Sequence, residues 1–500
     1  MRLENQSQTL SEGIMQAPRP PKGTLKLPEL YALSIGQVIG AGVITLVGPA
    51  LGLTGYSAWL GYVLAIALGF IQIFPIILIT STVRMSGGFY SLIAATTNKK
   101  IAGMFAVSQL TTMVSLSLFG VSLGVYINSV FPSVNPTMCG VVLLTFFYVI
   151  NLLGIDFMAS AQKLMTWFLI AALLMFIAAG LMRLKNPVFD FSGPMFMTNG
   201  LNGLLTSMFL FVYSTTGYSL TMNYGYQAKN ATRDIPRAIL LSVPTIFILY
   251  VGVAIAGSGV LPLEMVVGKP LTLVAKETLP GVLFAAFIIG GPVMALTTTM
   301  NSSMPSQCIP MQRACEDGWF PTSFAAQNKR GAPWKILTLN YALGLVPMLL
   351  GFNVNTIISN IMLLSSVRSF LQIYTYYQIP KRYPDAWKKS FLHMPDALYY
   401  MFCTFSLIGQ VFIFFYSARS LNPTIVTVSL TAIACCIVYS LVRSKSPSIQ
   451  IRASVWPGAD EDPPPQRNMS HISSLLDRMD AKIEAQNNLS ISASPDPGNP

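Results

Sequence analysis

Long apolar blocks alternate with short polar segments over most of the chain. We count twelve blocks, at roughly 28–52, 57–81, 102–130, 137–155, 160–182, 201–225, 237–262, 279–303, 335–352, 355–378, 397–417 and 423–442. Each is close to the roughly 20 residues that an α-helix needs to cross a hydrocarbon core about 30 Å thick. The pattern predicts an all-α polytopic membrane protein with 12 transmembrane helices.

Polar segments border this apolar region at both ends. Residues 1–24 are polar and contain prolines, so we expect a disordered N-terminal tail. From about residue 446 the composition changes to Ser, Pro, Asp and Asn, which predicts a second disordered tail over 446–500. Between the tails, residues 25–445 are expected to form one membrane domain.

The composition supports this reading and excludes a water-soluble enzyme. Charged residues make up 10% of the chain and hydrophobic residues 53%, whereas soluble globular proteins carry about 25% charged residues. An enzyme embedded in the membrane needs a carboxylate pair, a metal site or an activated nucleophile at that depth. The acidic residues before the C-terminal tail lie in loops or at span ends, and the six cysteines lack metal-ligand spacing. We therefore expect no enzymatic activity, no metal and no cofactor.

The basic residues indicate how the chain lies in the bilayer. Lys and Arg number 31 against 19 acidic residues, a formal charge of +12. They sit between apolar blocks, so they do not predict nucleic-acid binding. If the N-terminus is cytoplasmic, the outside loops hold only Arg183, Lys185, Lys269, Lys276 and Arg419. By the positive-inside rule, we expect a cell-membrane protein with both termini in the cytoplasm.

Two of the predicted spans carry sequences that interrupt a helix. Span 1 contains Gly40-Ala41-Gly42 near its middle, and span 6 contains Tyr213-Ser214-Thr215-Thr216-Gly217. A single glycine in a span often serves only close packing between helices. Here, however, the two interruptions are five spans apart, which is where an inverted repeat of five plus five helices places matching breaks.

An interrupted span exposes backbone groups that can bind a ligand. A bilayer tolerates unpaired N–H and C=O groups only where they line a cavity. The N-terminus of the half-helix after a break suits a carboxylate, and the last carbonyls before the break suit an ammonium group. Two adjacent breaks therefore predict a site for a zwitterion that needs no ionised side chain. A cationic substrate side chain would have no acidic partner within the spans.

Five motifs resemble those of the amino acid–polyamine–organocation (APC) permeases. They are Ile35–Ile44 in span 1, Ser86–Tyr90 after span 2, Asn151–Gly154 with Gln162 between spans 4 and 5, Lys229–Ile239 after span 6, and Asp317–Pro321 after span 8. Each motif is weak alone, but the set keeps the family's order over residues 25–440. The chain is therefore similar to APC permeases throughout its membrane domain.

The resemblance implies an alternating-access transporter with the leucine-transporter fold. Its 5+5 inverted repeat would cover about 28–182 and 201–378, with discontinuous helices 1 and 6 and with spans 11–12 added at about 397–442. The substrate carboxylate would lie on the backbone of Gly40, Ala41 and Gly42. The amino group would lie on carbonyls near Ile39 and around the second break. The full set of implied binding residues is Ile39, Gly40, Ala41, Gly42, Tyr213, Ser214, Thr215 and Gly217, with Tyr213 at the aromatic position that closes over the substrate in relatives.

Departures from the family pattern leave the coupling ion open. Some proton-coupled relatives hold a lysine in span 5, where this chain has Leu169. Lys163 lies nearer the cytoplasmic end and is interpreted as an anchor that reaches the membrane surface. Thr298, Thr299 and Ser302 have oxygens for sodium, but hydroxyls in a helix more often bond to their own backbone. Proton and sodium both remain candidate coupling ions.

Three functions are therefore compared. The first is a secondary transporter for a small, neutral amino acid, acting as an exchanger or an ion-coupled symporter. The second is a transporter of the same fold for a polyamine or another organic amine, which the lack of acids within the spans argues against. The third is a non-transporting amino acid sensor that signals through its C-terminal tail. The sequence assigns no role to Arg368, the one basic residue well inside a predicted span.

Overall fold

A computed structural model describes residues 23–40, 42–130, 133–351, 354–419, 423–452 and 454–458. The first half of the chain forms α2 (Leu27–Val38), α3 (Gly42–Thr45), α4 (Val47–Thr54), η1 (Gly55–Ser57), α5 (Ala58–Thr82), β1 (Val83–Met85), α6 (Gly88–Thr96), α7 (Lys99–Met113), α8 (Ser115–Val130), α9 (Pro136–Leu152) and α10 (Ile155–Leu181). The second half forms α11 (Gly200–Val212), η2 (Tyr213–Thr215), η3 (Tyr218–Gly225), α12 (Ala231–Gly259), α13 (Leu263–Val266), α14 (Thr272–Thr278), α15 (Gly281–Ile288), η4 (Ile289–Val293), α16 (Met294–Glu316), η5 (Thr322–Ala325), α17 (Trp334–Leu349), α18 (Val354–Tyr376), α19 (Ile379–Arg382), α20 (Pro384–Lys389), α21 (Asp396–Arg419), α22 (Pro423–Arg443) and β2 (Val455–Pro457).

Every predicted apolar block coincides with helical structure. Within the described residues, seven helical stretches are long and apolar enough to cross a membrane: Gly42–Thr82, Lys99–Asn128, Ile155–Leu181, Ala231–Gly259, Gly281–Glu316, Asp396–Phe415 and Val426–Arg443. Pro136–Leu152 and Gly200–Val212 are apolar but shorter. The protein is therefore a helical, multi-pass membrane protein, and the number of twelve spans stays a prediction.

Local sequence explains where several helices begin. The Asn98 side chain accepts a hydrogen bond from the backbone N–H of Ile101 at the start of α7. Asn135 caps α9 in the same way, and Pro136 occupies its first position. Asparagine caps satisfy an N–H group that has no partner within the helix, and proline at the first position costs no hydrogen bond.

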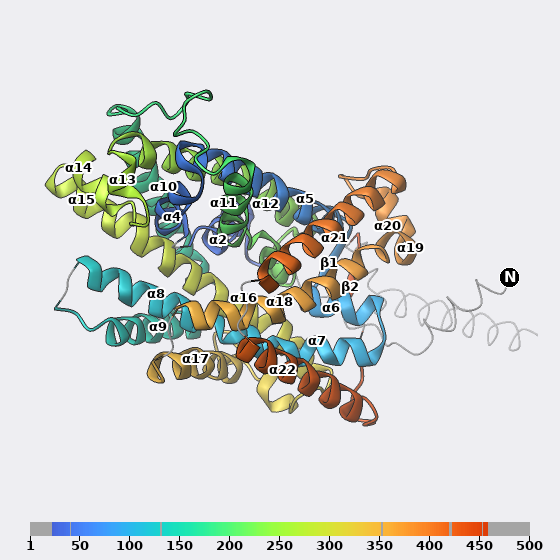
Figure 1. Ribbon diagram of the computed structural model, residues 1–500. Helices are drawn as coiled ribbons and strands as arrows, with labels where there is room; N and C mark the ends of the chain where they lie inside the picture. The colour runs from blue at the N-terminus through green and yellow to red at the C-terminus, as the bar shows by residue number, and fades with distance from the viewer. Residues whose placement is uncertain are drawn as a thin grey trace, which may run out of the picture. The chain divides into compact units, whose positions relative to one another are not determined.

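The interior of the membrane domain is built around α2, α5 and α12. α12 packs along α5, α10 and α2, and α2 also contacts α16 (Figure 1). α10 packs one face against these helices and leaves its other face on the outside, where Leu164, Trp167 and Phe168 are all more than half exposed. Large apolar side chains on the outer face of a hydrophobic helix are suited to contact with lipid tails.

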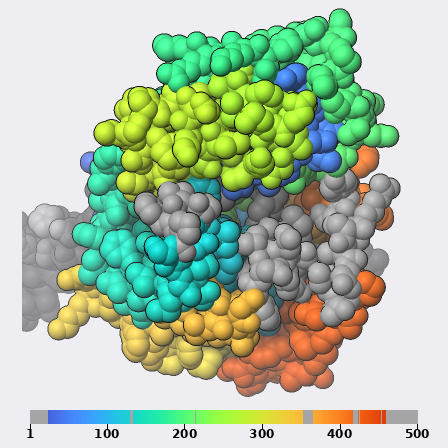
Figure 2. All heavy atoms as spheres, turned by 60° about the vertical axis from the view of Figure 1, so that its left-hand side comes forward, coloured from blue at the N-terminus to red at the C-terminus, as the bar shows by residue number. Residues whose placement is uncertain are grey.

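Short helices close one end of this domain. α13, α14 and α15 lie together at the end opposite β1, α19 and α20 (Figure 1). Figure 2 brings that end forward and shows them as one continuous surface beside α8 and α9. α15 runs into α16 through η4, a π-helical turn that contains Gly290, Gly291 and Pro292. Proline removes one backbone N–H, and the wider turn accommodates that loss.

At the other end, the chain after α22 forms a packed strap, defined here as residues 446–452 and 454–458. β2 pairs antiparallel with β1, with Arg84 opposite Trp456. The Ser454 hydroxyl lies 2.5 Å from that of Ser91 in α6. This differs from the expected disorder from residue 446, because Val455 and Trp456 are buried against the protein.

The middle of the strap bonds to Asp317, which forms a buried ion pair with Arg313. The Asp317 carboxylate, just after α16, accepts hydrogen bonds from Arg313 at 2.6 Å and from the backbone N–H of Arg452 at 3.3 Å. It also accepts one from the Tyr90 hydroxyl at 2.9 Å. Burial raises the pKa of Asp317 to about 6, although the charge of Arg313 and the Tyr90 hydrogen bond act in the opposite direction. The strap thus ties the end of α16 to the end of α5.

Candidate functional site

The first predicted break is present between α2 and α3. α2 ends at Val38, Ile39 is extended with φ −78° and ψ 93°, and helix resumes at Gly42. The N–H of Gly40 donates to the Val38 carbonyl at 3.0 Å. Ala41, the middle residue of the predicted motif, lies outside the described residues. The break leaves the carbonyls of Val38 and Ile39 outside the α-helical hydrogen-bond ladder.

The second predicted break follows α11. Tyr213–Thr215 form a short 3₁₀ turn, Thr216 is extended, and Gly217 has φ +134°. The hydroxyls of Ser214 and Thr215 turn back onto the carbonyls of Phe211 and Val212, at 2.9 and 3.1 Å. The side chain of Tyr213 lies outside the described residues, so its closure over a substrate stays a prediction.

The two breaks are in contact with each other. A Cβ atom on Gly42 would lie 2.5 Å from the Cβ of Ser214. A Cβ atom on Gly217 would lie 2.4 Å from the carbonyl oxygen of Gln37, and its positive φ also disfavours any side chain. Of the predicted site residues, the structure therefore brings together Gly42 and Ser214, and it places Gly217 against the end of α2, where Ile39 follows.

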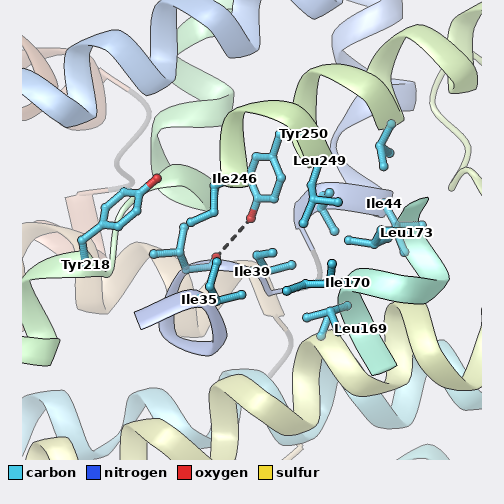
Figure 3. Close-up of a cluster of buried hydrophobic side chains, with 14 of the residues drawn as sticks. Ile35, Ile39, Ile44, Leu169, Ile170, Leu173, Tyr218, Ile246, Leu249 and Tyr250 are labelled. Atoms are coloured by element: carbon cyan, nitrogen blue, oxygen red, sulfur yellow. Dashed lines mark hydrogen bonds between the residues drawn. The ribbon is translucent and has the colours of Figure 1, made fainter. Parts of the chain in front are cut away.

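Two buried tyrosines fix the positions of the breaks by hydrogen bonds to their carbonyls. The Tyr250 hydroxyl, from α12, lies 3.1 Å from the Val38 carbonyl oxygen and 2.9 Å from that of Ser214. Figure 3 shows its ring pointing toward Ile39, with a hydrogen bond at the end of α2. Tyr62, from α5, donates to the Gly42 carbonyl at 3.1 Å and stacks on Phe211.

Sequence reasoning missed both tyrosines. A buried tyrosine needs a partner for its hydroxyl, and one tyrosine each in spans 2 and 7 was the available signal. Nothing in their sequence neighbourhood showed that the partners were the carbonyls of the breaks, because those contacts span 20 residues for Tyr62 and 212 for Tyr250 with Val38.

A chain of buried amides fixes α2 to the helices behind it. Asn301 in α16 donates to the Gln162 side chain at 2.9 Å, and Gln162 in α10 donates to the Ala32 carbonyl at 3.4 Å. Thr166 donates to the same carbonyl at 3.1 Å. A Cβ atom on Gly36 would lie 1.9 Å from the Gln162 amide nitrogen, so Gly36 is a packing residue here.

The oxygens considered for a sodium ion bond to their own helix. The Thr298 hydroxyl lies 2.7 Å from the Met294 carbonyl, and Ser302 donates to the Thr298 carbonyl at 2.8 Å. Thr299 lies 2.8 Å from the Ala295 carbonyl and 3.1 Å from that of Ile39. In the described part of the chain, no group of three or more His, Cys, Asp or Glu is arranged to hold a metal ion.

The position expected to hold a coupling lysine is apolar. Leu169 is fully buried in a cluster with Ile39 and Ile44 beside the first break (Figure 3). Lys163, one and a half turns earlier in α10, instead forms an ion pair with Glu29 at 2.6 Å. No ammonium group therefore comes from Leu169 or Lys163 to the space that a coupling ion would occupy.

A cavity of about 370 Å³ borders the second break. Thr216 and Gly217 line one side, and Gln72 of α5 and Arg368 of α18 line others. Its size falls within the range of small-molecule sites, roughly 300–1,000 Å³. Backbone groups, amides and hydroxyls line it together with apolar side chains, and this combination suits a small polar molecule.

Comparisons with known proteins place this arrangement among transporters. Residues 25–442 match the family described as amino acid permease. A branched-chain amino acid permease of Bacillus subtilis is 26% identical over 351 residues, which cover 64% of this chain and 74% of the relative. A methylthioribose transporter of the same organism is 25% identical, covering 60% and 69%. A general amino acid permease of Saccharomyces cerevisiae is 22% identical, covering 78% and 74%.

Proposed function

Because this chain belongs to the amino acid permease family of the APC permeases, we propose that it moves a small amino acid across the cell membrane by alternating access. Its relatives are permeases and transporters, so the protein is a membrane transporter and not an enzyme. The cell membrane and the cytoplasmic position of both termini belong to the proposal, and the neutral character of the substrate stays a prediction from the sequence.

The contact between the two breaks is the observation that carries the proposal. Gly42 of the first break lies against Ser214, and Gly217 of the second break lies against Gln37 and Val38 within the membrane domain. An amino acid carries one carboxylate and one ammonium group, and helix ends offer N–H groups for the first and carbonyls for the second. Within the described residues, no Asp or Glu lines the adjacent cavity, which disfavours a cationic substrate side chain.

Alternating access would follow from movement of one half of the domain against the other. We propose twelve spans with a 5+5 inverted repeat, in which spans 1, 2, 6 and 7 rock against spans 3, 4, 5 and 8. Tyr62 of span 2 bonds to the first break, and Tyr250 of span 7 bonds to both breaks. The two tyrosines would therefore move together with the breaks. Thr299 belongs to span 8 and bonds to Ile39 across the moving boundary.

The environment of the first break favours exchange over proton coupling. Leu169 cannot carry a proton, and the hydroxyls of Thr298 and Ser302 are already bonded to their own helix. These hydroxyls donate their hydrogens to helix carbonyls, and their oxygens keep lone pairs that can still bind a sodium ion. Under this proposal, one amino acid leaves as another enters, and a symporter driven by proton or sodium is the alternative.

Uptake by liposomes that contain the purified protein tests the function. Labelled neutral and acidic amino acids and a polyamine would be supplied with and without internal amino acid, and with and without a proton or sodium gradient. We expect uptake of an amino acid that depends on internal amino acid and is not inhibited by the polyamine. Uptake driven by a gradient alone would favour a symporter, and uptake of the polyamine but no amino acid would contradict the proposal.

A further inference from the structure

An arginine faces the cavity beside the second break. Arg368 lies in α18 and lines the cavity together with Thr216 and Gly217. Its guanidinium carbon lies 5.0 Å from the centre of the Phe105 ring, which belongs to α7. This cation–π contact orients the guanidinium plane. The N–H groups at the edge of that plane stay available for a ligand.

No acidic residue neutralises this arginine in the described part of the chain. The ion pairs of Lys163 with Glu29 and of Arg313 with Glu316 and Asp317 lie away from the cavity. The α18 sequence contains no Asp or Glu, and none lines the cavity. An arginine charge at membrane depth is costly unless it is paired or hydrated. The cavity therefore holds an uncompensated positive charge.

Two buried donors in this cavity have no acceptor among the described residues. The Nε of Arg368 is buried and makes no hydrogen bond. The side-chain nitrogen of Gln72, which lines the cavity from α5, is also buried and makes no hydrogen bond. Buried donors without partners are rare and costly. Both groups lack an acceptor, and the nearby charge is positive, so an anionic acceptor is the ligand that satisfies them.

We propose that Arg368 and Gln72 bind the side-chain carboxylate of a dicarboxylic amino acid, such as glutamate or aspartate. A carboxylate accepts several hydrogen bonds and pairs with the planar guanidinium. The α-ammonium and α-carboxylate of the same molecule lie at the two breaks, and its side chain crosses Thr216 and Gly217 into the cavity. This inference rests on the proposed transport function and names an acidic substrate, where the sequence predicts a neutral one.

The proposal predicts that the protein discriminates between substrates of nearly the same shape. Glutamine has nearly the shape of glutamate, but its neutral amide leaves the Arg368 charge uncompensated in the cavity. A buried charge that loses its partner disfavours the wrong ligand more than a change in shape does. The protein should therefore prefer glutamate to glutamine and aspartate to asparagine.

Variants of the two donors test the assignment. Uptake of labelled glutamate, glutamine and leucine would be measured in liposomes for wild type, Arg368→Gln, Arg368→Lys and Gln72→Met. Gln307→Met is the matched control, because Gln307 is a buried glutamine that does not line the cavity. We expect wild type to prefer glutamate, and Arg368→Gln to lower the ratio of glutamate to glutamine uptake by about tenfold or more. Arg368→Lys should lie between them, and Gln307→Met should leave the ratio unchanged.

The outcomes separate this inference from the transport function. If wild type takes up glutamine or leucine in preference to glutamate, and Arg368→Gln leaves that ratio unchanged, the inference is wrong and the transport function stands. If wild type takes up no amino acid, both are wrong. Where Arg368→Gln does not fold, the comparison of Gln72→Met with Gln307→Met decides. A lower glutamate ratio only in Gln72→Met supports the inference, and equal ratios overturn it.

Discussion

Two glycines show how single residues shape the site. Gly42 and Gly217 stand where the breaks touch, and each leaves room for one group of the other span. The neighbour of Gly42 is a side chain, Ser214, which another substitution can remove. The neighbour of Gly217 is the backbone oxygen of Gln37, which no substitution can remove. The two glycines therefore make different predictions.

Gly217→Ala should abolish substrate binding and lower stability. The new methyl group would lie 2.4 Å from the Gln37 oxygen, and φ of +134° is unfavourable for alanine. Gly268→Ala is the matched control, since Gly268 also has positive φ, +73°, but no atom lies within 4 Å of the place that its new methyl group would take. Thermal stability in detergent and amino acid affinity would be measured for both. Equal effects of the two substitutions would show that the contact between the breaks is unimportant.

At the scale of elements, one hydroxyl joins three helical segments. Tyr250 of α12 bonds to the last turn of α2 and to η2. The amide chain from Asn301 through Gln162 to Ala32 holds α2 from its other side. The positions of the two breaks thus depend on hydrogen bonds from helices that contain no break.

Tyr250→Phe should misalign the breaks. Loss of a buried hydrogen bond to a carbonyl costs about 1–3 kcal/mol when the carbonyl is left without a partner. Tyr399→Phe is the control, because the buried Tyr399 hydroxyl also donates to a carbonyl, that of Tyr376 at 2.9 Å, away from the breaks. Both variants should lose thermal stability, and only Tyr250→Phe should also lose affinity for the amino acid. If both kept full affinity, Tyr250 would be a packing residue only.

The sequence predicted the elements better than the contacts between them. Apolar blocks and interrupted spans are local patterns, so the helices and both breaks were found. The roles of Tyr62, Tyr250 and Asn301 depend on partners distant in the chain, and single-sequence patterns do not contain such pairs. The packed strap was missed for a related reason. Its polar composition predicts disorder, but β1 and Asp317 supply the hydrogen bonds that order it.

At the scale of the whole molecule, the strap connects parts that the proposed transport cycle moves apart. It pairs with β1 at the end of α5, which is span 2, and bonds to Asp317 at the end of α16, which is span 8. In the proposed mechanism, spans 2 and 8 belong to opposite halves of the domain. The strap is therefore expected to hold the cytoplasmic side closed.

Truncation separates the strap from the residues that follow it. A cysteine at Ser91, whose hydroxyl meets that of Ser454, should be protected from thiol reagents in the full chain and after truncation at residue 458. It should react after truncation at residue 445, in a background without native cysteines. Both truncated chains should retain amino acid flux. A full chain that binds an amino acid without flux, and that loses a signalling output after removal of residues 459–500, would instead support the sensor hypothesis.

The central claim is that the contact between the two breaks forms the amino acid site, and a pair of compensating substitutions tests it most directly. Amino acid affinity would be measured for wild type, Gly42→Ala, Ser214→Gly and the double variant. Overpacking typically costs about 1–3 kcal/mol of folding stability; a break displaced by the new methyl group also loses binding free energy, at about 1.4 kcal/mol for each tenfold in affinity. We predict that Gly42→Ala weakens binding by roughly tenfold to a hundredfold, and that Ser214→Gly restores it by removing the Cβ atom 2.5 Å away. Unchanged affinity in Gly42→Ala would contradict the account.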